Sequence, residues 1–267
     1  MMSTVSDKKK ALIECLPSGG PIIISFSGGV DSSLLAAVAR ECRGDQVRCI
    51  LLDSPLVPRK AVLEAVKTAE DLGVPCEVIP FPVMEVNEFR CNPKNRCYLC
   101  KKMSSRILRA YAERLGSPCV ADGMNASDLD EYRPGLCAAT EEGIRHPFIE
   151  AGITKTEIRE IAKNDGFPFW DKPSSACLAS RIPYREEITA EKLQMIEKAE
   201  SFLAGHGFTQ VRVRLHDTSA RIELIPEEME KAFLIRGDLI RRFHEIGFHC
   251  VTLDLSGFRS GSMDEVS

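Results

Sequence analysis

The sequence lacks long hydrophobic runs and an excess of basic residues. None of the apolar stretches in the 267 residues approaches the ~20 residues that cross a bilayer. The charged N-terminal segment MMSTVSDKKK is not followed by the apolar core of a secretory signal. We therefore expect a cytoplasmic protein without a membrane span. The formal net charge of −4 argues against a general RNA or DNA binder, because phosphate contacts dominate such binding.

Several nucleotide and metal motifs are also missing. The chain has neither G-x-x-x-x-G-K-[ST] nor G-x-G-x-x-G, which excludes a Walker A loop and a dinucleotide fingerprint. The pair Cys97 and Cys100 in NRCYLCKK has no second C-x-x-C pair to form a zinc ribbon. The eleven cysteines are an odd number, and four of them lie in apolar runs and are predicted to be core thiols: Cys49, Cys76, Cys119 and Cys250.

Strand and helix patterns alternate over the first 170 residues. Short apolar, β-branched runs at 21–26, 47–53, 76–81 and 119–123 predict buried strands. The segments between them predict helices, of which 58–73 ends at a glycine and 101–116 follows an irregular stretch. This alternation predicts an α/β fold with a parallel, doubly wound sheet.

The remaining sequence predicts a junction and a second domain. Thr154 and Glu157 have capping-box spacing at the start of a helix that stops at Gly166. Residues 171–188 then show no clear period and contain Cys177, and residues 189–267 predict a small α+β domain of αββαβ order. We expect a nucleotide-binding domain at 1–170, a junction loop at 171–188, and a substrate-binding or oligomerisation domain at 189–267.

The most informative stretch is SFSGGVDSS, residues 25–33. Gly28 and Gly29 allow a sharp turn that brings backbone N–H groups close to an anion. The following helix directs its positive end at the same place. Ser27 and Ser32 add hydroxyl donors, and Asp31 can hold a metal ion or cap the helix. These features predict a phosphate site; the alternative is an ordinary turn capped by Asp31.

The order S-G-G-x-D-S after a first strand resembles the PP-loop of the ATP pyrophosphatases. The resemblance implies that ATP is cleaved between its α and β phosphates and that AMP passes to an oxygen of the substrate. A later loop, DGMNASDLDEYRPG, has residue types that suit Mg²⁺ and triphosphate, although Asp and Asn are also common turn formers. Asp31 is the candidate magnesium ligand, and the ATP site is expected to comprise Ser25, Ser27, Gly28, Gly29, Val30, Asp31, Ser32, Ser54, Gly123, Asp128 and Arg133, with Asp122 and Asn125 nearby in the sequence.

Longer segments resemble one subfamily, the LarE sulfur transferases. They are KPSSACLASRIPY, PFIEAGITKTEIREIAKNDGFPFWDKP, ADGMNASDLDEYRPG and VRVRLHDTSARIEL, and the resemblance covers about residues 10–255. It implies an enzyme that makes the organic part of the nickel-pincer nucleotide, the cofactor of lactate racemase. ATP would adenylate a carboxylate of pyridinium-3,5-biscarboxylic acid mononucleotide, and sulfur would displace AMP to give a thiocarboxylate.

The family resemblance gives the cysteines a role. In its best-known members one cysteine, at the position of Cys177, gives up its sulfur and ends as dehydroalanine. This sequence also has Cys97 and Cys100, and three thiolates can hold three irons of a [4Fe–4S] cluster whose fourth iron carries the sulfide to be donated; some members resemble this form. Sacrificial Cys177, zinc on the three cysteines, and a Cys97–Cys100 disulfide acting on a Cys177 persulfide are the alternatives. Both cysteine segments are predicted to be polar loops.

A group of polar residues is expected to bind the mononucleotide. Ser180 and Arg181 follow Cys177 and suit an anion, and Arg181 also suits lowering the pKa of a neighbouring thiol. Period-two alternation places Arg212, Arg214 and His216 on one face of a strand, either as a phosphate site or as an ordinary solvated face. Glu200 interrupts an apolar helix stripe, and we expect Arg212 or Arg214 to pair with it.

Two rival functions remain open on the sequence alone. A PP-loop tRNA thiolase can also combine SGGxDS with C-x-x-C and a third cysteine, although the acidic charge argues against RNA. An adenine-nucleotide sensor would use the same fold without catalysis. The family resemblance implies a homo-oligomer, a hexamer, and the sequence does not indicate the sulfide source.

Overall fold

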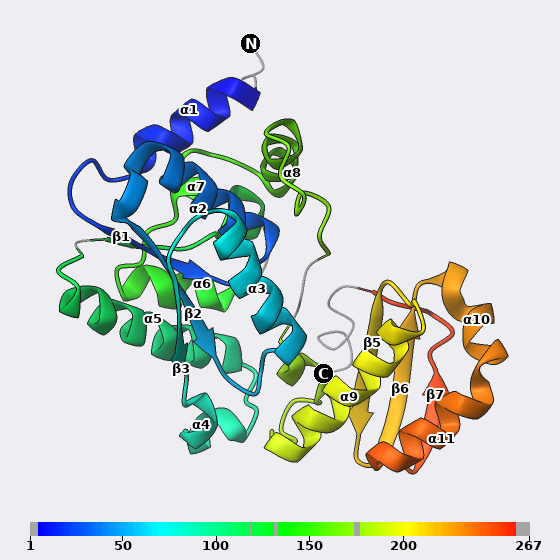
Figure 1. Cartoon of the computed structure of the whole chain (residues 1–267). Helices are drawn as coiled ribbons and strands as arrows, with labels where there is room; N and C mark the ends of the chain where they lie inside the picture. The colour runs from blue at the N-terminus through cyan, green and yellow to red at the C-terminus, as the bar shows by residue number, and fades with distance from the viewer. Residues whose placement is uncertain (1–4, 118, 131–132, 174–176, 260–267) are drawn as a thin grey trace. The chain divides into compact units, whose positions relative to one another are not determined.

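The computed structural model describes residues 5–117, 119–130, 133–173 and 177–259. These form two compact units (Figure 1). The first unit comprises Met1–Ser54, Arg59–Val83 and Asn95–Ser175, and the second comprises Pro55–Pro58, Met84–Lys94 and Ala176–Ser267. Within the described ranges, no helix is both long enough and apolar enough to cross a membrane.

A parallel sheet of order β3-β2-β1-β4 forms the centre of the first unit. Ile22, Ile23 and Ile24 of the central strand β1 are all fully buried, as expected for a parallel strand covered on both faces. The predicted α/β fold is confirmed, and the strands are β1 (Ile22–Phe26), β2 (Val47–Asp53), β3 (Cys76–Pro80) and β4 (Cys119–Ala121).

Helices cover both faces of this sheet. On one face, α5 and α6 enclose a core that includes Ile23, Ile50 and Val120 of the strands and Leu108 of α5. The crossovers after β1 and β2 place α2 and α3 on the other face, where α1 and α8 pack against α2. The helices of this unit are α1 (Val5–Cys15), α2 (Val30–Arg43), α3 (Arg59–Asp71), α5 (Arg96–Arg114), α6 (Pro134–Glu141), α7 (Pro147–Glu150) and α8 (Lys155–Asn164).

Some predicted details are confirmed and others are wrong. Thr154 and Glu157 form the predicted capping box of α8. Cys49 and Cys119 are buried as predicted, whereas Cys250 is exposed because it lies on β7, at the edge of the second sheet. The helix predicted at 101–116 begins at Arg96, so Cys97 and Cys100 lie on a helix and not in a loop.

The second unit contains a three-stranded sheet of order β5-β6-β7. Strands β5 and β6 are antiparallel and β6 and β7 are parallel, so the chain returns through two helices before β7. The single helix predicted from Pro226 is two helices in the structure, which are separated at Ile235. The elements are α4 (Asn87–Arg90), α9 (Ala190–Gly205), β5 (Val211–His216), β6 (Ser219–Leu224), α10 (Met229–Leu234), α11 (Arg236–Ile246) and β7 (Cys250–Leu253).

Two short segments far away in sequence hold the chain around Cys177. The Leu178 N–H donates to the Leu56 carbonyl oxygen at 2.9 Å, and the Ile188 N–H donates to that of Arg90 at 2.8 Å. Asn92, which has a φ of 54°, donates from its side chain to the Pro183 carbonyl oxygen at 2.7 Å. Residues 55–58 and 84–94 thus belong with the second unit, although the sequence reading placed them in the first domain.

Candidate functional site

The Gly-rich loop lies at the carboxyl end of β1 and leads directly into α2. Gly28 has a φ of 66°, a conformation that glycine adopts without strain, and a Cβ there would lie 2.5 Å from the Ala65 Cβ on α3. Gly29 is the extended N-cap residue of α2. The first N–H groups of a helix have no intrahelical partners, so this tight turn suits a phosphate group.

Two serine hydroxyls brace the loop. The Ser27 N–H donates to the Ser32 Oγ at 3.2 Å, and the two Oγ atoms lie 3.1 Å apart. The Ser32 hydroxyl donates in turn to the Gly29 carbonyl oxygen at 3.3 Å. Ser32 therefore shapes the loop from within, and Ser27 is the more exposed of the two hydroxyls.

Asp31 does not cap α2, so the expected capping alternative is wrong. Gly29 is the N-cap and receives no side-chain cap. Asp31 is the second residue of α2 and lies in its first turn, where its Oδ2 is 2.8 Å from the Lys155 Nζ and 3.4 Å from the Asn125 Nδ2. Its Oδ1 is buried without a hydrogen-bond partner. This oxygen is suited to act as a ligand of a cation, because burying an acceptor without a partner costs free energy.

The chain after β4 packs directly against this helix turn. A Cβ at Gly123 would lie 2.8 Å from the Ser32 backbone nitrogen, so only glycine fits there. The neighbouring Asp122 is buried and bonds the Lys101 Nζ and the His146 Nδ1, each at 2.7 Å. Burial opposes ionisation of Asp122, but the Lys101 ammonium and the His146 hydrogen bond lower its pKa to about 2. This carboxylate therefore stays charged beside the loop.

The loop DGMNASDLDEYRPG contains a capped 3-10 turn. The Asp128 Oδ2 accepts from the Asn125 N–H at 3.0 Å and the Asn125 Oδ1 accepts from the Ser127 N–H at 3.1 Å. Arg133 forms an ion pair with the Asp128 Oδ1 at 3.0 Å. These contacts agree with the turn-forming alternative for Asn125 and Asp128.

Other expected ATP-site residues border the loop. Ser25 is paired with Ile50 inside the sheet. Val30 is buried in the first turn of α2. Ser54 follows β2 and is buried, and its carbonyl oxygen accepts from Arg59 at 2.7 Å. Lys172, which the sequence reading did not select, donates to the Gly28 carbonyl oxygen at 3.1 Å.

Cys97 and Cys100 lie three residues apart in the first turns of α5, so they share a helix face. Cys97 is exposed and Cys100 is half-buried. The next residue, Lys101, bonds Asp122, and Tyr98 donates to the Glu141 carboxylate of α6 at 2.5 Å. These contacts fix the start of the helix. In the part of the chain that the structure describes, no group of three His, Cys, Asp or Glu side chains forms a metal site.

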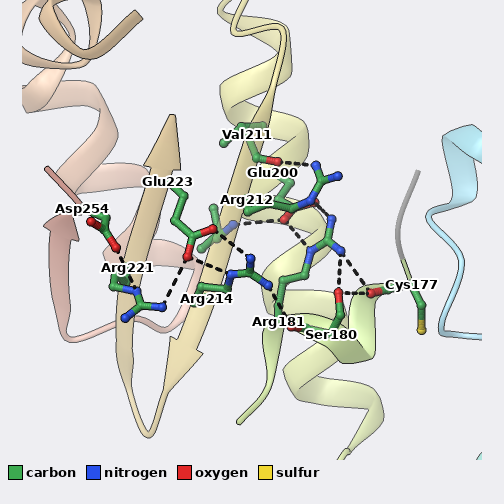
Figure 2. Close-up of polar contacts among 11 residues, drawn as sticks. Cys177, Ser180, Arg181, Glu200, Val211, Arg212, Arg214, Arg221, Glu223 and Asp254 are labelled. Atoms are coloured by element: carbon green, nitrogen blue, oxygen red, sulfur yellow. Dashed lines mark hydrogen bonds and ion pairs between the residues drawn. The ribbon is translucent and has the colours of Figure 1, made fainter. Parts of the chain in front are cut away.

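Cys177 begins a 3-10 turn, Leu178–Arg181, in the second unit. Its side chain is exposed, and its carbonyl oxygen accepts from the Ser180 hydroxyl at 2.7 Å and from the Arg181 Nη1 at 3.1 Å. Figure 2 shows the sulfur pointing away from the Arg181 guanidinium. Arg181 therefore contacts the Cys177 backbone, and this contact does not support the expected effect on the thiol.

Four charged side chains form two buried ion pairs beside this turn. Arg181 meets Glu200 through two hydrogen bonds of 2.9 and 3.0 Å. Arg214 meets Glu223 through bonds of 3.0 and 2.8 Å, and its Nη1 donates to the Ser180 carbonyl oxygen at 2.9 Å. The expected ion pair of Glu200 is present, but the arginine that forms these two hydrogen bonds is Arg181 of the turn, whereas Arg214 bonds Glu223 (Figure 2).

Arg212 lies among these pairs, on the same strand face as Arg214. Its Nη1 donates to the Val211 carbonyl oxygen at 2.7 Å, and its guanidinium lies over the Phe258 ring. Burial and the neighbouring Arg181 charge lower the pKa of Arg212 to about 10. The electrostatic environment here favours an added anion. His216, at the end of the strand, is half-buried, so the face is not an ordinary solvated one.

Sequence reasoning missed four residues of the first-unit site. Lys101, Lys155 and Lys172 contact Asp122, Asp31 and the Gly28 carbonyl oxygen, and His146 contacts Asp122. A lysine is usually a surface residue, so the residue type alone did not mark these three. The position of Lys155 directly after the N-cap Thr154 was the available signal, because that helix end belongs beside the sheet's carboxyl edge.

Comparison with known proteins agrees with this geometry. No protein-family model matches the chain. The chain is 42% identical to an uncharacterised protein of Synechocystis sp. over 246 residues, which cover 91% of this chain and 92% of that protein. It is 36% identical to the pyridinium-3,5-bisthiocarboxylic acid mononucleotide synthase of Lactiplantibacillus plantarum over 266 residues, 99% of this chain and 96% of that protein.

A more distant relative matches part of the chain. The tRNA-specific 2-thiouridylase MnmA of Moorella thermoacetica is 27% identical over 216 residues, 66% of this chain and 60% of that protein. The parallel sheet and the glycine turn before α2 are in keeping with this PP-loop relationship. Together with the match along almost the full length of the bisthiocarboxylic acid synthase, these findings show that the chain belongs to the LarE family of PP-loop ATP-dependent sulfur transferases.

Proposed function

We propose that this enzyme converts pyridinium-3,5-biscarboxylic acid mononucleotide to its thiocarboxylates at the expense of ATP. The observation that carries this proposal is the match to a bisthiocarboxylic acid mononucleotide synthase over 99% of the chain. A substrate carboxylate oxygen attacks the α-phosphorus of ATP, and pyrophosphate leaves. A sulfur nucleophile then attacks the activated carbonyl carbon, the C–O bond to AMP breaks, and AMP leaves. The second carboxylate is converted in the same way.

The first unit is proposed to bind ATP. The turn at Gly28 and Gly29, the N-terminus of α2 and the Ser27 hydroxyl suit the pyrophosphate that leaves. Gly123 lets the chain after β4 approach the Ser32 backbone nitrogen, which keeps this side of the loop narrow. Ser25, Val30 and Ser54 would support the loop from the sheet side, and Asp128 and Arg133 would support the neighbouring turn.

Mg²⁺ is the metal ion that fits Asp31. The buried Asp31 Oδ1 without a hydrogen-bond partner is a hard oxygen ligand of the type that Mg²⁺ prefers. When bound, the ion would neutralise charge on the phosphates that are being separated.

The second unit is proposed to bind the substrate mononucleotide. Arg212, crowded by Arg181 and Arg214 and with a lowered pKa, would receive its phosphate, because an anion relieves the repulsion among the three cations. The Glu200 and Glu223 carboxylates hold Arg181 and Arg214 in fixed orientations, so the cations are arranged before the substrate arrives. Ser180 lies between this cluster and Cys177 and would orient the reacting end.

The sulfur source is proposed to be a [4Fe–4S] cluster on Cys97, Cys100 and Cys177. The thiol donors are of the type that such a cluster needs: Cys97 and Cys100 share a helix face, on which Cys97 is exposed and Cys100 is half-buried, and Cys177 is exposed. When bound, such a cluster would supply a sulfide on an iron that lacks a protein thiolate. Without it, Cys177 itself would donate its sulfur. We also propose a homo-oligomer, a hexamer, on the family resemblance, and a cytoplasmic location.

The proposal is tested by following products. AMP and pyrophosphate should form only when the mononucleotide is present, together with a thiocarboxylate detected by mass spectrometry. Asp31→Ala should lower AMP formation at least about hundredfold, in line with lost electrostatic stabilisation, while Asp45→Ala, an exposed acid in the first unit, should leave it unchanged. Thiolated tRNA in place of the thiocarboxylate, or ATP binding without AMP, would favour one of the two rival functions.

A further inference from the structure

The Asp31 carboxylate has two unlike oxygens. Oδ2 contacts the Lys155 ammonium at 2.8 Å and the Asn125 amide at 3.4 Å. Oδ1 is buried and has no hydrogen-bond partner. Leaving a charged oxygen without a partner costs free energy, so the contact with Lys155 satisfies this carboxylate only in part. The Asp31 carboxylate can therefore bind a further cation through Oδ1.

Lys155 is well placed to leave Asp31. It is the first residue of α8, and its backbone N–H is fixed by the Ser127 hydroxyl at 3.1 Å. Its side chain is 39% exposed and that of Asp31 is 20% exposed. A lysine ammonium on a flexible stem changes partners readily, and a partly exposed ion pair is weak. The backbone stays in place while the charge can move.

The charges around the loop determine where the ammonium moves. The N-terminus of α2, the N-terminus of α8 and Lys172, which bonds the Gly28 carbonyl oxygen, all bring positive charge to this region. A divalent cation on Asp31 would repel the nearby ammonium. A polyphosphate bound on the loop would attract it.

We propose that Lys155 is an exchangeable counter-ion: it occupies Asp31 in the empty site and transfers to the phosphates of the nucleotide when a divalent cation takes its place. The proposal rests on the ATP-binding role proposed above. No covalent bond changes, because the exchange only replaces one ion-pair partner by another. Binding of the metal ion and binding of the nucleotide should therefore assist each other. A metal ion that binds alone displaces the Lys155 ammonium without offering it an anion, whereas the bound nucleotide supplies phosphates that the ammonium can contact.

The test measures Mn²⁺ binding, which does not depend on turnover. Electron paramagnetic resonance measures the free Mn²⁺ in a titration of the full chain. The titration is made first without a nucleotide and then with α,β-methylene-ATP, which cannot be cleaved between its α and β phosphates. The variants are Lys155→Met and Lys155→Arg. Lys163→Met is the matched control, because Lys163 lies on the same helix, with its Nζ 4.7 Å from the centre of the Trp170 ring, and loses the same charge.

Lys155→Met should bind Mn²⁺ alone about three- to tenfold more tightly than the wild type, since a competing charge is removed. The same variant should bind α,β-methylene-ATP more weakly, because it lacks the ammonium that would contact the phosphates. Mn²⁺ and the nucleotide analogue should then no longer strengthen each other's binding. Lys155→Arg and Lys163→Met should behave like the wild type in the Mn²⁺-only measurement.

Unchanged or weaker Mn²⁺ binding by Lys155→Met, in a protein that melts like the wild type, would overturn the counter-ion role. Lys155→Gln gives a second neutral variant if the first does not fold. A wild-type protein that binds Mn²⁺ but never the analogue would instead overturn the ATP-binding role.

Discussion

Arg181 and Glu200 join the turn after Cys177 to the sheet of the second unit. Two hydrogen bonds of 2.9 and 3.0 Å connect the guanidinium and the carboxylate, and the side chain of Arg181 is only 3% exposed. The Glu200 Oε1 also accepts from the Val213 N–H of β5 at 3.0 Å. One carboxylate thus bonds both an arginine of the turn and the backbone of a strand.

Replacing Glu200 should destabilise the protein. In Glu200→Ala, Arg181 remains buried without its carboxylate, and breaking one side of a buried pair costs about 3 kcal/mol. Urea unfolding measures the loss. The control is Asp238→Ala, which breaks the exposed pair with Arg241 and should cost below about 1 kcal/mol. Equal small losses from both variants would show that the Arg181–Glu200 pair adds little to stability.

Arg212→Ala should weaken binding of the mononucleotide and not that of ATP. Losing a charged hydrogen bond of about 1.5–3 kcal/mol predicts a KM for the mononucleotide raised about tenfold to hundredfold. Arg236→Ala, on an exposed position of α11, should change neither constant. Steady-state kinetics with each substrate varied in turn provides the measurement. If both KM values rise together, the phosphate binds elsewhere.

Cys97→Ala should change how many times the enzyme turns over. A cluster that needs this thiolate is lost, and at best one sulfur per chain then comes from Cys177. Product per chain, together with iron and acid-labile sulfide after oxygen-free reconstitution, gives the answer. Cys137→Ala, which removes another exposed cysteine of the first unit, is the control. Multiple turnovers in Cys97→Ala would exclude Cys97 from the sulfur source.

The Asp122 carboxylate should make stability depend on acid pH. Although burial opposes it, Lys101 and His146 lower the pKa of Asp122 from its ordinary 3.8 to about 2. A group with a lowered folded-state pKa stabilises the fold above its unfolded pKa, and this stability is lost as pH falls. The free energy of unfolding should therefore lose about 2 kcal/mol from this group between about pH 4 and pH 2.

Comparison with Asp122→Asn isolates that contribution. The stability difference between wild type and variant should shrink as pH falls through the same window. Asp45→Asn, at a nearly fully exposed acid, should show a constant difference. A constant difference for Asp122→Asn would mean that the carboxyl keeps an ordinary pKa.

The sheet and the glycine loop were predictable because their signals are local. Alternating apolar strands and capped helices reveal an α/β fold, and SGGVDS requires a tight turn before a helix. The start of α5 was not predictable. Cys97 and Tyr98 have modest helix propensity, and the helix is held there by the contacts of Tyr98 with Glu141 and of Lys101 with Asp122.

The partners of the site residues could not be predicted for a related reason. Strand periodicity correctly places Arg212 and Arg214 on one face, yet it cannot show that Glu200 pairs with Arg181 from an irregular turn. The contact between Lys155 and Asp31 joins residues 124 positions apart. Such pairs depend on how the crossover connections bring distant helix ends together at one sheet edge.

The interleaving of the two units limits how this enzyme can be divided or recombined. The chain passes between them after residues 54, 58, 83, 94 and 175. A fragment that begins at Ala176 would lack Leu56, Arg90 and Asn92, whose backbone groups pair with the chain between Leu178 and Ile188. The unit that carries Cys177 is therefore not a transferable module, and a fusion or gene rearrangement that moved it alone would leave part of its scaffold behind.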